Sequence, residues 1–157
     1  MEELAKQVGA FLEQKQWKLV VAESCTGGGL GESITSISGS SNWFDRGFIT
    51  YSNESKIEML GVDLAIIEQH GAVSEETVLA MAKGALMRSA ARIGVAISGI
   101  AGPDGGSPEK PVGTVWIAWA GKFGYRTQLF VFKGNRAQVR KQAVESALKG
   151  ILAAGNL

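Results

Sequence analysis

Two apolar runs that each end in a glycine-rich segment most constrain the fold of this chain. The first run, WKLVVAES at 17–24, is followed by CTGGGLG, and the second, RIGVAISG at 92–99, is followed by IAGPDGG. Short apolar runs bounded by turn signals predict buried strands. Helical patterns lie before and between these two runs, and two further strand-like runs follow the second. This order predicts a single domain over 1–157, an α/β fold built as a three-layer α/β/α sandwich with a mixed sheet.

Periodicity and capping residues predict where the individual elements lie. We expect strands at 17–24, 48–52, 92–99, 113–121 and 125–133, of which the last two form a hairpin. We expect helices at 3–15, 28–38, 53–61 and 62–71, a long one that Ser74 caps, and one from 135 to about 153. Ligands of such sheets gather beyond the carboxyl ends of the strands, so the two glycine-rich segments are expected to meet over one site.

Composition excludes several classes of function. The net charge of +1 argues against broad electrostatic binding to nucleic acid or to an anionic membrane. No run of 18 apolar residues predicts a membrane span, and the acidic, amphipathic N-terminal segment lacks the pattern of a signal peptide. A single Cys excludes an internal disulfide and favours a reducing cytoplasm. With one Cys and one His, neither a zinc site nor another metal site is expected.

The first glycine cluster has two interpretations. Its spacing matches neither the dinucleotide-binding pattern G-x-G-x-x-G nor a Walker A loop. Gly27 and Gly28 either allow a close strand-to-helix turn, or expose backbone N–H groups that bind an anion or a developing oxyanion at the start of a helix. The residues alone leave both interpretations open.

The same segment carries two candidate nucleophiles, Ser24 and Cys25. The only histidine, His70, precedes a glycine at a predicted helix end, so a triad that contains histidine has little support. Serine–lysine chemistry is an alternative, because Tyr51 and Lys56 lie five residues apart after the predicted second strand, where both side chains can reach one cleft. The competing interpretation makes Tyr51 a half-buried strand residue and Lys56 a solvated helix residue.

The second glycine-rich segment, SGIAGPDGGSPEKPVGT, is either a mobile surface loop or part of a site. A loop of this length inside a compact domain is more often functional than idle. Arg46, Arg136 and Arg140 are candidate anchors for a phosphate group, since arginine binds phosphate in bidentate geometry. Arg136 and Arg140 lie one helical turn apart, which is equally compatible with a solvated helix face.

Four segments, read together, resemble the CinA C-terminal domain family. They are AESCTGG at 22–28, GSSNWFDRGFITYSNESK at 39–56, HGAVSEE at 70–76 and SGIAGPDGGSPEKPVGTVW at 98–116, in order across essentially the whole chain. The family contains stand-alone nicotinamide-nucleotide amidohydrolases and the C-terminal halves of larger CinA proteins. At this length the chain resembles the stand-alone form.

The resemblance implies hydrolysis of the carboxamide of nicotinamide mononucleotide, in pyridine nucleotide salvage, without a cofactor. The catalytic serine, tyrosine and lysine of the family fall on Ser24, Tyr51 and Lys56, and this sequence departs from the pattern at none of them. The residues expected to surround the substrate are Cys25, Thr26, Gly27, Gly28, Arg46, Gly99, Ala101, Gly102, Gly105 and Thr114, with Arg46 as the leading phosphate contact. A homodimer is expected from apolar hairpin and helix faces. The alternative is a catalytically silent nucleotide-binding or regulatory module of the same fold.

Overall fold

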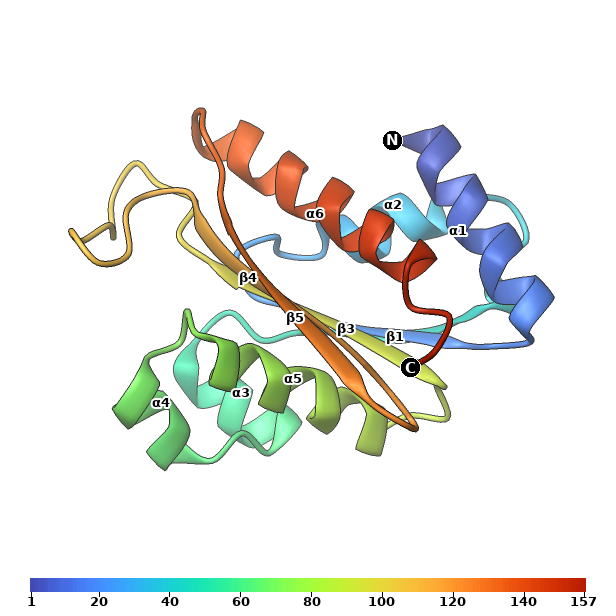
Figure 1. Ribbon diagram of the computed structural model, residues 1–157, viewed down its shortest axis with the longest axis horizontal. Coiled ribbons are helices and arrows are strands. Elements are labelled where there is room, and N and C mark those ends of the chain that lie inside the picture. The colour runs from blue at the N-terminus through green and yellow to red at the C-terminus, as the bar shows by residue number, and fades with distance from the viewer.

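Five strands form one mixed sheet in the order β2-β1-β3-β4-β5 (Figure 1). The computed structural model describes residues 1–157. The strands are β1 (Leu19–Glu23), β2 (Phe44–Ile49), β3 (Ile93–Gly99), β4 (Thr114–Gly121) and β5 (Tyr125–Val131). Strand β1 pairs in parallel with β2 and β3, whereas β4 runs antiparallel to both β3 and β5. The mixed sheet and the hairpin that the sequence predicted are confirmed.

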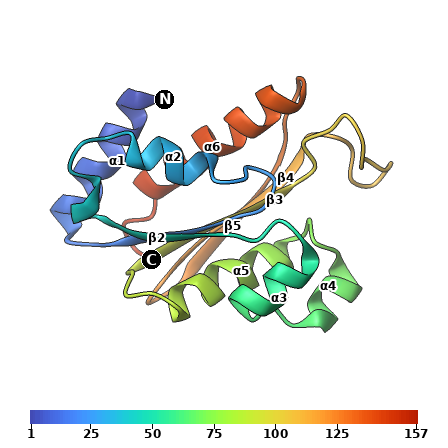
Figure 2. The same cartoon turned by 180° about the vertical axis from the view of Figure 1, so that it is seen from behind.

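Helices cover both faces of this sheet (Figures 1 and 2). One layer contains α1 (Glu2–Lys15), α2 (Gly29–Thr35) and α6 (Arg136–Leu152), and the other contains α3 (Asn53–Leu60), α4 (Leu64–His70) and α5 (Glu75–Met87). A short 3₁₀ helix, η1 (Ser40–Asn42), precedes β2. The three-layer α/β/α architecture is therefore confirmed. No helix is both long and apolar enough to cross a bilayer.

The central strands lie between two hydrophobic cores. They present large side chains to one core and small side chains to the other. Large residues such as Ile97 and Trp119 face α1, α2 and α6, whereas Ala96 and Ala118 face the layer that contains α5. A Cβ atom on Gly94 would lie 3.0 Å from the Ala82 carbonyl oxygen of α5. Small residues on this face thus allow α5 to lie close against the sheet.

Side-chain caps begin four of the helices. The oxygen atoms of Ser52, Asp63, Ser74 and Asn135 accept hydrogen bonds from backbone N–H groups in the first turns of α3, α4, α5 and α6. Helix α3 ends at Gly61 in the left-handed conformation, as glycine permits. The caps at Ser74 and Asn135 confirm the expected starts of α5 and α6, and α3 begins at the expected residue 53 with Ser52 as its cap.

The second strand differs from its expected position. Strand β2 spans Phe44–Ile49 rather than 48–52, and it lies at the edge of the sheet with mostly exposed or half-exposed residues. Its polar residues Asp45 and Arg46 and the following Gly47 interrupt the apolar run by which a strand is recognised. The chain then turns at 50–52, because Ser52 already caps α3. The helix expected at 28–38 is also shorter, and ends at Thr35.

The order of connections creates a crevice at one end of the sheet. Strand β1 leads into α2 on one face, whereas its neighbour β2 leads into α3 on the opposite face (Figure 2). Chains that depart in opposite directions leave room between them beyond the carboxyl ends of the strands. Ser24 follows β1 directly and Tyr51 follows β2, so both lie at this crevice.

Candidate active site

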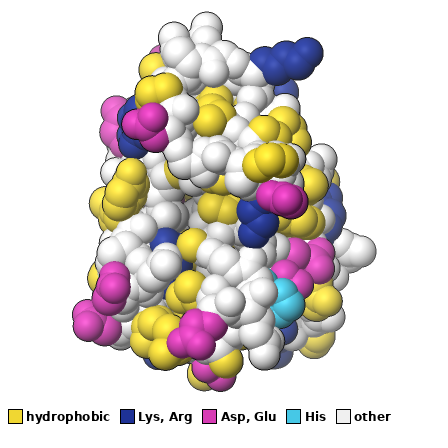
Figure 3. Space-filling model, turned by 90° about the vertical axis from the view of Figure 1, so that its left-hand side faces the viewer, with side chains coloured by type: hydrophobic (Ala, Val, Ile, Leu, Met, Phe, Trp, Pro, Cys, Tyr) yellow, Lys and Arg dark blue, Asp and Glu magenta, His cyan; other side chains and the backbone are white.

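A pocket of about 220 Å³ lies where β1, β2 and β3 end. Figure 3 looks onto this end of the molecule and shows the surface hollowed there. The lining residues are Ser24, Cys25, Tyr51, Asn53, Lys56, Ala72, Val73, Ser98, Gly99, Ala101 and Arg136. The pocket therefore brings together the serine, tyrosine and lysine that the sequence singled out, although Ser24 follows one strand and Tyr51 and Lys56 follow another.

Lys56 reaches the pocket floor from the first turn of α3. Its Nζ atom lies 3.0 Å from Ser24 Oγ, 3.0 Å from the Thr50 carbonyl oxygen and 3.1 Å from the Tyr51 carbonyl oxygen. An ammonium group donates to all three oxygens. A neutral amine donates its two hydrogens to the two carbonyls and directs its lone pair at Ser24. The geometry thus suits a lysine that accepts the proton of the serine hydroxyl.

Burial favours that neutral form. The Lys56 side chain is only 1% exposed, and none of the ion pairs in the molecule involves it. Burial lowers the pKa of Lys56 below its ordinary value of 10.5, against a smaller opposing effect of the nearby Cys25 thiolate. A lysine with a lowered pKa can act as a base closer to neutral pH.

Ser24 is held at the turn between β1 and α2. Its backbone N–H donates to the Ile97 carbonyl of β3 at 3.0 Å, and its hydroxyl lies 3.4 Å from the Tyr51 carbonyl oxygen. The chain then turns through Gly27 and Gly28, whose φ angles are +58° and +104°. Residues with a Cβ atom rarely adopt such angles, so the conformation of the turn is enough to explain why glycine occupies both positions.

Glu23 occupies the amino end of α2, one of the places expected for an anion or an oxyanion. Its carboxylate is buried and accepts from the Thr26 hydroxyl at 2.6 Å, the Leu30 N–H at 2.8 Å and the Gly31 N–H at 3.0 Å. Neither the first turn of α2 nor the Thr26 side chain is therefore free to meet a substrate. The N–H of Cys25 makes no hydrogen bond to another residue, and Cys25 lines the pocket. Among the backbone donors of this loop without a hydrogen bond to another residue, the Cys25 N–H is the one that belongs to a pocket-lining residue.

Tyr51 contacts Ser24 and Lys56 through its backbone carbonyl rather than through its hydroxyl group. Its carbonyl oxygen accepts from Lys56, whereas its side chain is 62% exposed and its hydroxyl lies 3.2 Å from Arg136 Nη2. Arg136 also donates to the Gly102 carbonyl at 2.8 Å. Together Tyr51 and Arg136 form one side of the pocket mouth.

Cys25, the competing nucleophile, is poorly activated. Its side chain is 6% exposed, and burial raises the pKa of the thiol from 9.0 to about 11. The thiolate is the reactive form of cysteine, and at neutral pH it is scarce at such a pKa. The geometry and the pKa thus favour Ser24 over Cys25.

The second glycine-rich loop contributes only part of what was expected. Gly99 and Ala101 line the pocket, and Gly102 lies beside it through its contact with Arg136. Gly105 is exposed, and the Thr114 hydroxyl donates to the Pro111 carbonyl at the base of the loop. Neither of these two lines the pocket.

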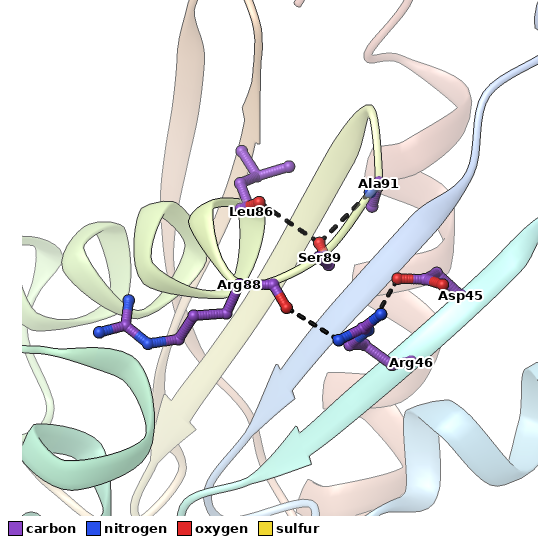
Figure 4. Close-up of polar contacts among 6 residues, drawn as sticks. All are labelled: Asp45, Arg46, Leu86, Arg88, Ser89 and Ala91. Carbon is purple, nitrogen blue, oxygen red and sulfur yellow. Dashed lines mark hydrogen bonds and ion pairs between the residues drawn. The ribbon is translucent and has the colours of Figure 1, made fainter.

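Arg46, the leading phosphate candidate, is not brought to the pocket. Its guanidinium pairs with Asp45 at 2.8 Å and donates to the Arg88 carbonyl at 3.0 Å (Figure 4). Arg88 follows the last residue of α5, a helix of 13 residues that begins beside the pocket residue Val73. A helix of this length spans about 20 Å, so Arg46 lies toward the other end of the sheet. Arg46 lies early in β2, whereas the ligands of such sheets meet the ends of strands rather than their starts.

Sequence reasoning missed several residues of the site. Ser98 is 1% exposed and its hydroxyl donates to the Ala72 carbonyl at 2.8 Å, which ties the end of β3 to the turn before α5. Ala72, Val73 and Asn53 line the pocket but carry no chemical signature of their own. The sequence gives no signal for Glu23 beyond its place near the end of an apolar run. No cluster of three or more His, Cys, Asp or Glu side chains is placed to hold a metal ion.

The fold and the site define an α/β protein with a buried serine–lysine pair at the switch point of its sheet. The family model described as the CinA C-terminal domain matches residues 1–154. The chain therefore belongs to the CinA C-terminal domain family, which confirms the resemblance seen in the sequence.

Individual relatives cover nearly the whole chain. Proteins named nicotinamide-nucleotide amidohydrolase PncC from Enterobacter agglomerans and from Escherichia coli K12 are each 53% identical to it. The matches cover 97% and 94% of this chain and 93% and 90% of those proteins, respectively. The crystal structure of the competence/damage inducible protein CihA from Agrobacterium tumefaciens has a TM-score of 0.95 at 43% identity, over 97% of this chain and 93% of that one.

Proposed function

We propose that this protein hydrolyses the carboxamide of nicotinamide mononucleotide, and so forms nicotinate mononucleotide and ammonia. The observation that carries the proposal is the 3.0 Å contact between Ser24 Oγ and the buried Lys56 Nζ inside the pocket. The printed names of the relatives support a nicotinamide nucleotide as the substrate. Pyridine nucleotide salvage is the corresponding metabolic role.

In the first half of the reaction, Ser24 attacks the carboxamide carbon while neutral Lys56 accepts the hydroxyl proton. The carbonyl oxygen of the substrate becomes an oxyanion, toward which the N–H of Cys25 donates. When the C–N bond breaks, the Lys56 ammonium returns its proton to the leaving group, which departs as ammonia. Lys56 is then neutral again and the nicotinoyl group is bound to Ser24 as an ester.

In the second half, a water molecule attacks the ester carbon and loses its proton to Lys56. The oxyanion forms again at the same donor, and Ser24 leaves with the proton that Lys56 returns. The Thr50 and Tyr51 carbonyls hold the amine in place through both halves, because each accepts one of its hydrogens. This chain's own residues supply every proton transfer in the scheme.

The pocket mouth is the place for the nucleotide part of the substrate. Arg136 is the exposed cation that lines the pocket, and its contacts to Tyr51 and Gly102 hold its guanidinium there. Arginine binds phosphate through parallel N–H donors. We therefore assign the phosphate contact to Arg136 in place of Arg46, and assign to Tyr51 a role in shaping the mouth.

The test is ammonia release by the purified protein from nicotinamide mononucleotide. Ser24→Ala should lower kcat by about 10³-fold or more, the usual loss for a covalent serine nucleophile. Cys25→Ala is the matched control and should retain most of the activity. A Ser24→Ala protein with near-native turnover, or a loss confined to Cys25→Ala, would refute the proposed mechanism.

The alternative is a catalytically silent nucleotide-binding module. It predicts tight binding of nicotinamide mononucleotide, measured by calorimetry, without release of ammonia. The buried Ser24–Lys56 contact argues against this alternative, because nucleotide binding alone does not require a lysine whose burial lowers its pKa. A homodimer and a cytoplasmic location remain predictions.

A further inference from the structure

We propose that Arg140, which lies outside the pocket, strengthens the Cys25 N–H as an oxyanion donor through two intervening peptide groups. The inference rests on the proposed amide hydrolysis and assigns a positioning role within it. Arg140 lies on α6 behind the loop that connects β1 to α2, and it does not line the pocket that contains Ser24 and Lys56.

A continuous chain of hydrogen bonds leads from Arg140 to the pocket. Arg140 Nη2 donates to the Thr26 carbonyl at 3.1 Å. The N–H of the same peptide group belongs to Gly27, and it donates to the Ser24 carbonyl at 3.0 Å. The N–H of that second peptide group belongs to Cys25, which lines the pocket and makes no hydrogen bond to another residue. The chain thus begins at a full positive charge and ends at the Cys25 N–H, whose hydrogen-bond partner is the sulfur of its own side chain, a weak acceptor.

Both ends of the loop are anchored. Arg140 Nε donates to the Cys25 carbonyl at 3.1 Å, so one guanidinium group donates hydrogen bonds to two successive carbonyls. On the other side, Glu23 holds the Thr26 hydroxyl and the first N–H groups of α2. Between these two anchors the Gly27 N–H donates back to the Ser24 carbonyl.

Each link of such a chain polarises the next. A donor bound to a carbonyl draws electron density from its peptide group, so that the N–H of this group donates more strongly, by about 10–30% per bond. The effect is larger where water is excluded and where the first donor carries a charge. An oxyanion gains more from a strengthened donor than a neutral carbonyl does, so the effect should appear in the transition state rather than in substrate binding.

The alternative role for Arg140 is direct contact with the substrate phosphate. Arg140 does not line the pocket that contains Ser24 and Lys56, and the arginine that does is Arg136. The two roles predict opposite kinetics. A phosphate contact affects KM, whereas the relay affects kcat.

Steady-state kinetics with nicotinamide mononucleotide therefore test the relay. Arg140→Gln should lower kcat by about two- to eightfold with KM unchanged, because a 10–30% change in a donor whose entire loss costs about 10²–10³-fold corresponds to that range. Arg140→Lys keeps the charge but cannot grip both carbonyls, so its kcat should lie between those of Arg140→Gln and the wild type. Lys141→Gln removes an exposed neighbouring charge and should leave both constants unchanged. A raised KM at unchanged kcat, or an equal loss in Lys141→Gln, would overturn the relay.

Hydrogen exchange at the Gly27 amide tests the middle link without any substrate. In Arg140→Gln and Arg140→Lys this amide should exchange about fivefold faster or more, because its hydrogen bond to Ser24 is weakened. Unchanged exchange of Gly27 in both variants, with the rest of the amides protected, would refute the relay even if the wild type failed to release ammonia. Failure of the proposed function would instead appear as absence of ammonia release by the wild type.

Discussion

Replacing the buried Lys56 with methionine should change how the stability of the fold depends on pH. Burial lowers the pKa of Lys56 in the folded state, whereas the unfolded chain keeps the ordinary value of 10.5. Between these two pKa values the unfolded state binds one more proton than the folded state, so the free energy of unfolding rises with pH. Below the folded-state pKa both states are charged, and the full cost of burying the ammonium is present. Lys56→Met removes this dependence.

The size of the effect follows from the contacts of Lys56. Within the window the wild type should gain up to about 1.4 kcal/mol per pH unit relative to Lys56→Met. Methionine also leaves the Thr50 carbonyl without the donor that Lys56 supplied, a loss of about 1–3 kcal/mol. That loss does not depend on pH, so it shifts the curve of the variant without changing its slope.

Urea unfolding at intervals from pH 7 to pH 10 measures the difference directly. Lys149→Met is the matched control, since the Lys149 side chain is 64% exposed and its only ion pair is to Glu145 on the same helix. The control should follow the wild type at every pH. Parallel curves for the wild type and Lys56→Met, or a wild type that loses stability relative to the variant as pH rises, would refute the reasoning. The same variant should lose about 10²–10⁴-fold in kcat as the proposed base is removed.

Two more predictions concern the arginines and the cysteine. Arg136→Gln should raise KM for nicotinamide mononucleotide by about 10–10²-fold, because one charged hydrogen bond to the phosphate is lost. Arg46→Gln should leave steady-state kinetics unchanged. The opposite pattern would show that Arg46, and not Arg136, contacts the phosphate. Cys25, whose pKa burial raises from 9.0 to about 11, should react with iodoacetamide about 10²-fold more slowly than an ordinary thiol at pH 8. Mass spectrometry of the folded and urea-unfolded protein measures this, and fast labelling in the folded state would show that the thiol is activated.

Elements with strong local signals were predictable from the sequence. Ser74 and Asn135 are followed by residues with helical spacing, and the helices α5 and α6 begin directly after them. Strand β1 is buried on both faces, so its apolar run stands out. Strand β2 was misplaced because an edge strand with one exposed side needs no such run.

Site residues were predictable where the side chain itself has distinctive chemistry. They were not predictable where the role of a residue depends on its contacts in the folded structure. The residues alone left the pairing of Ser24 with Lys56 open, and the family resemblance supplied it. The role of the Tyr51 carbonyl, the grip of Arg140 on the loop and the capping of α2 by Glu23 depend on backbone groups that look alike in every sequence. Arg46 and Arg136 are equivalent by composition, and only the register of β2 and the start of α6 separate them.

The spacing between Thr50, Tyr51 and Lys56 has a physical cause in the geometry of a helix start. Side chains of a helix lean toward its amino end, so a lysine in the first turn of α3 points back at the residues just before the helix. Those residues are Thr50 and Tyr51, whose carbonyls have left the sheet and can accept from Lys56. The first turn of a helix also carries positive partial charge, which disfavours a cation there. An arrangement that holds the amine in place and also disfavours its charged form is what a base needs, and a one-turn shift of Lys56 along α3 would lose both effects.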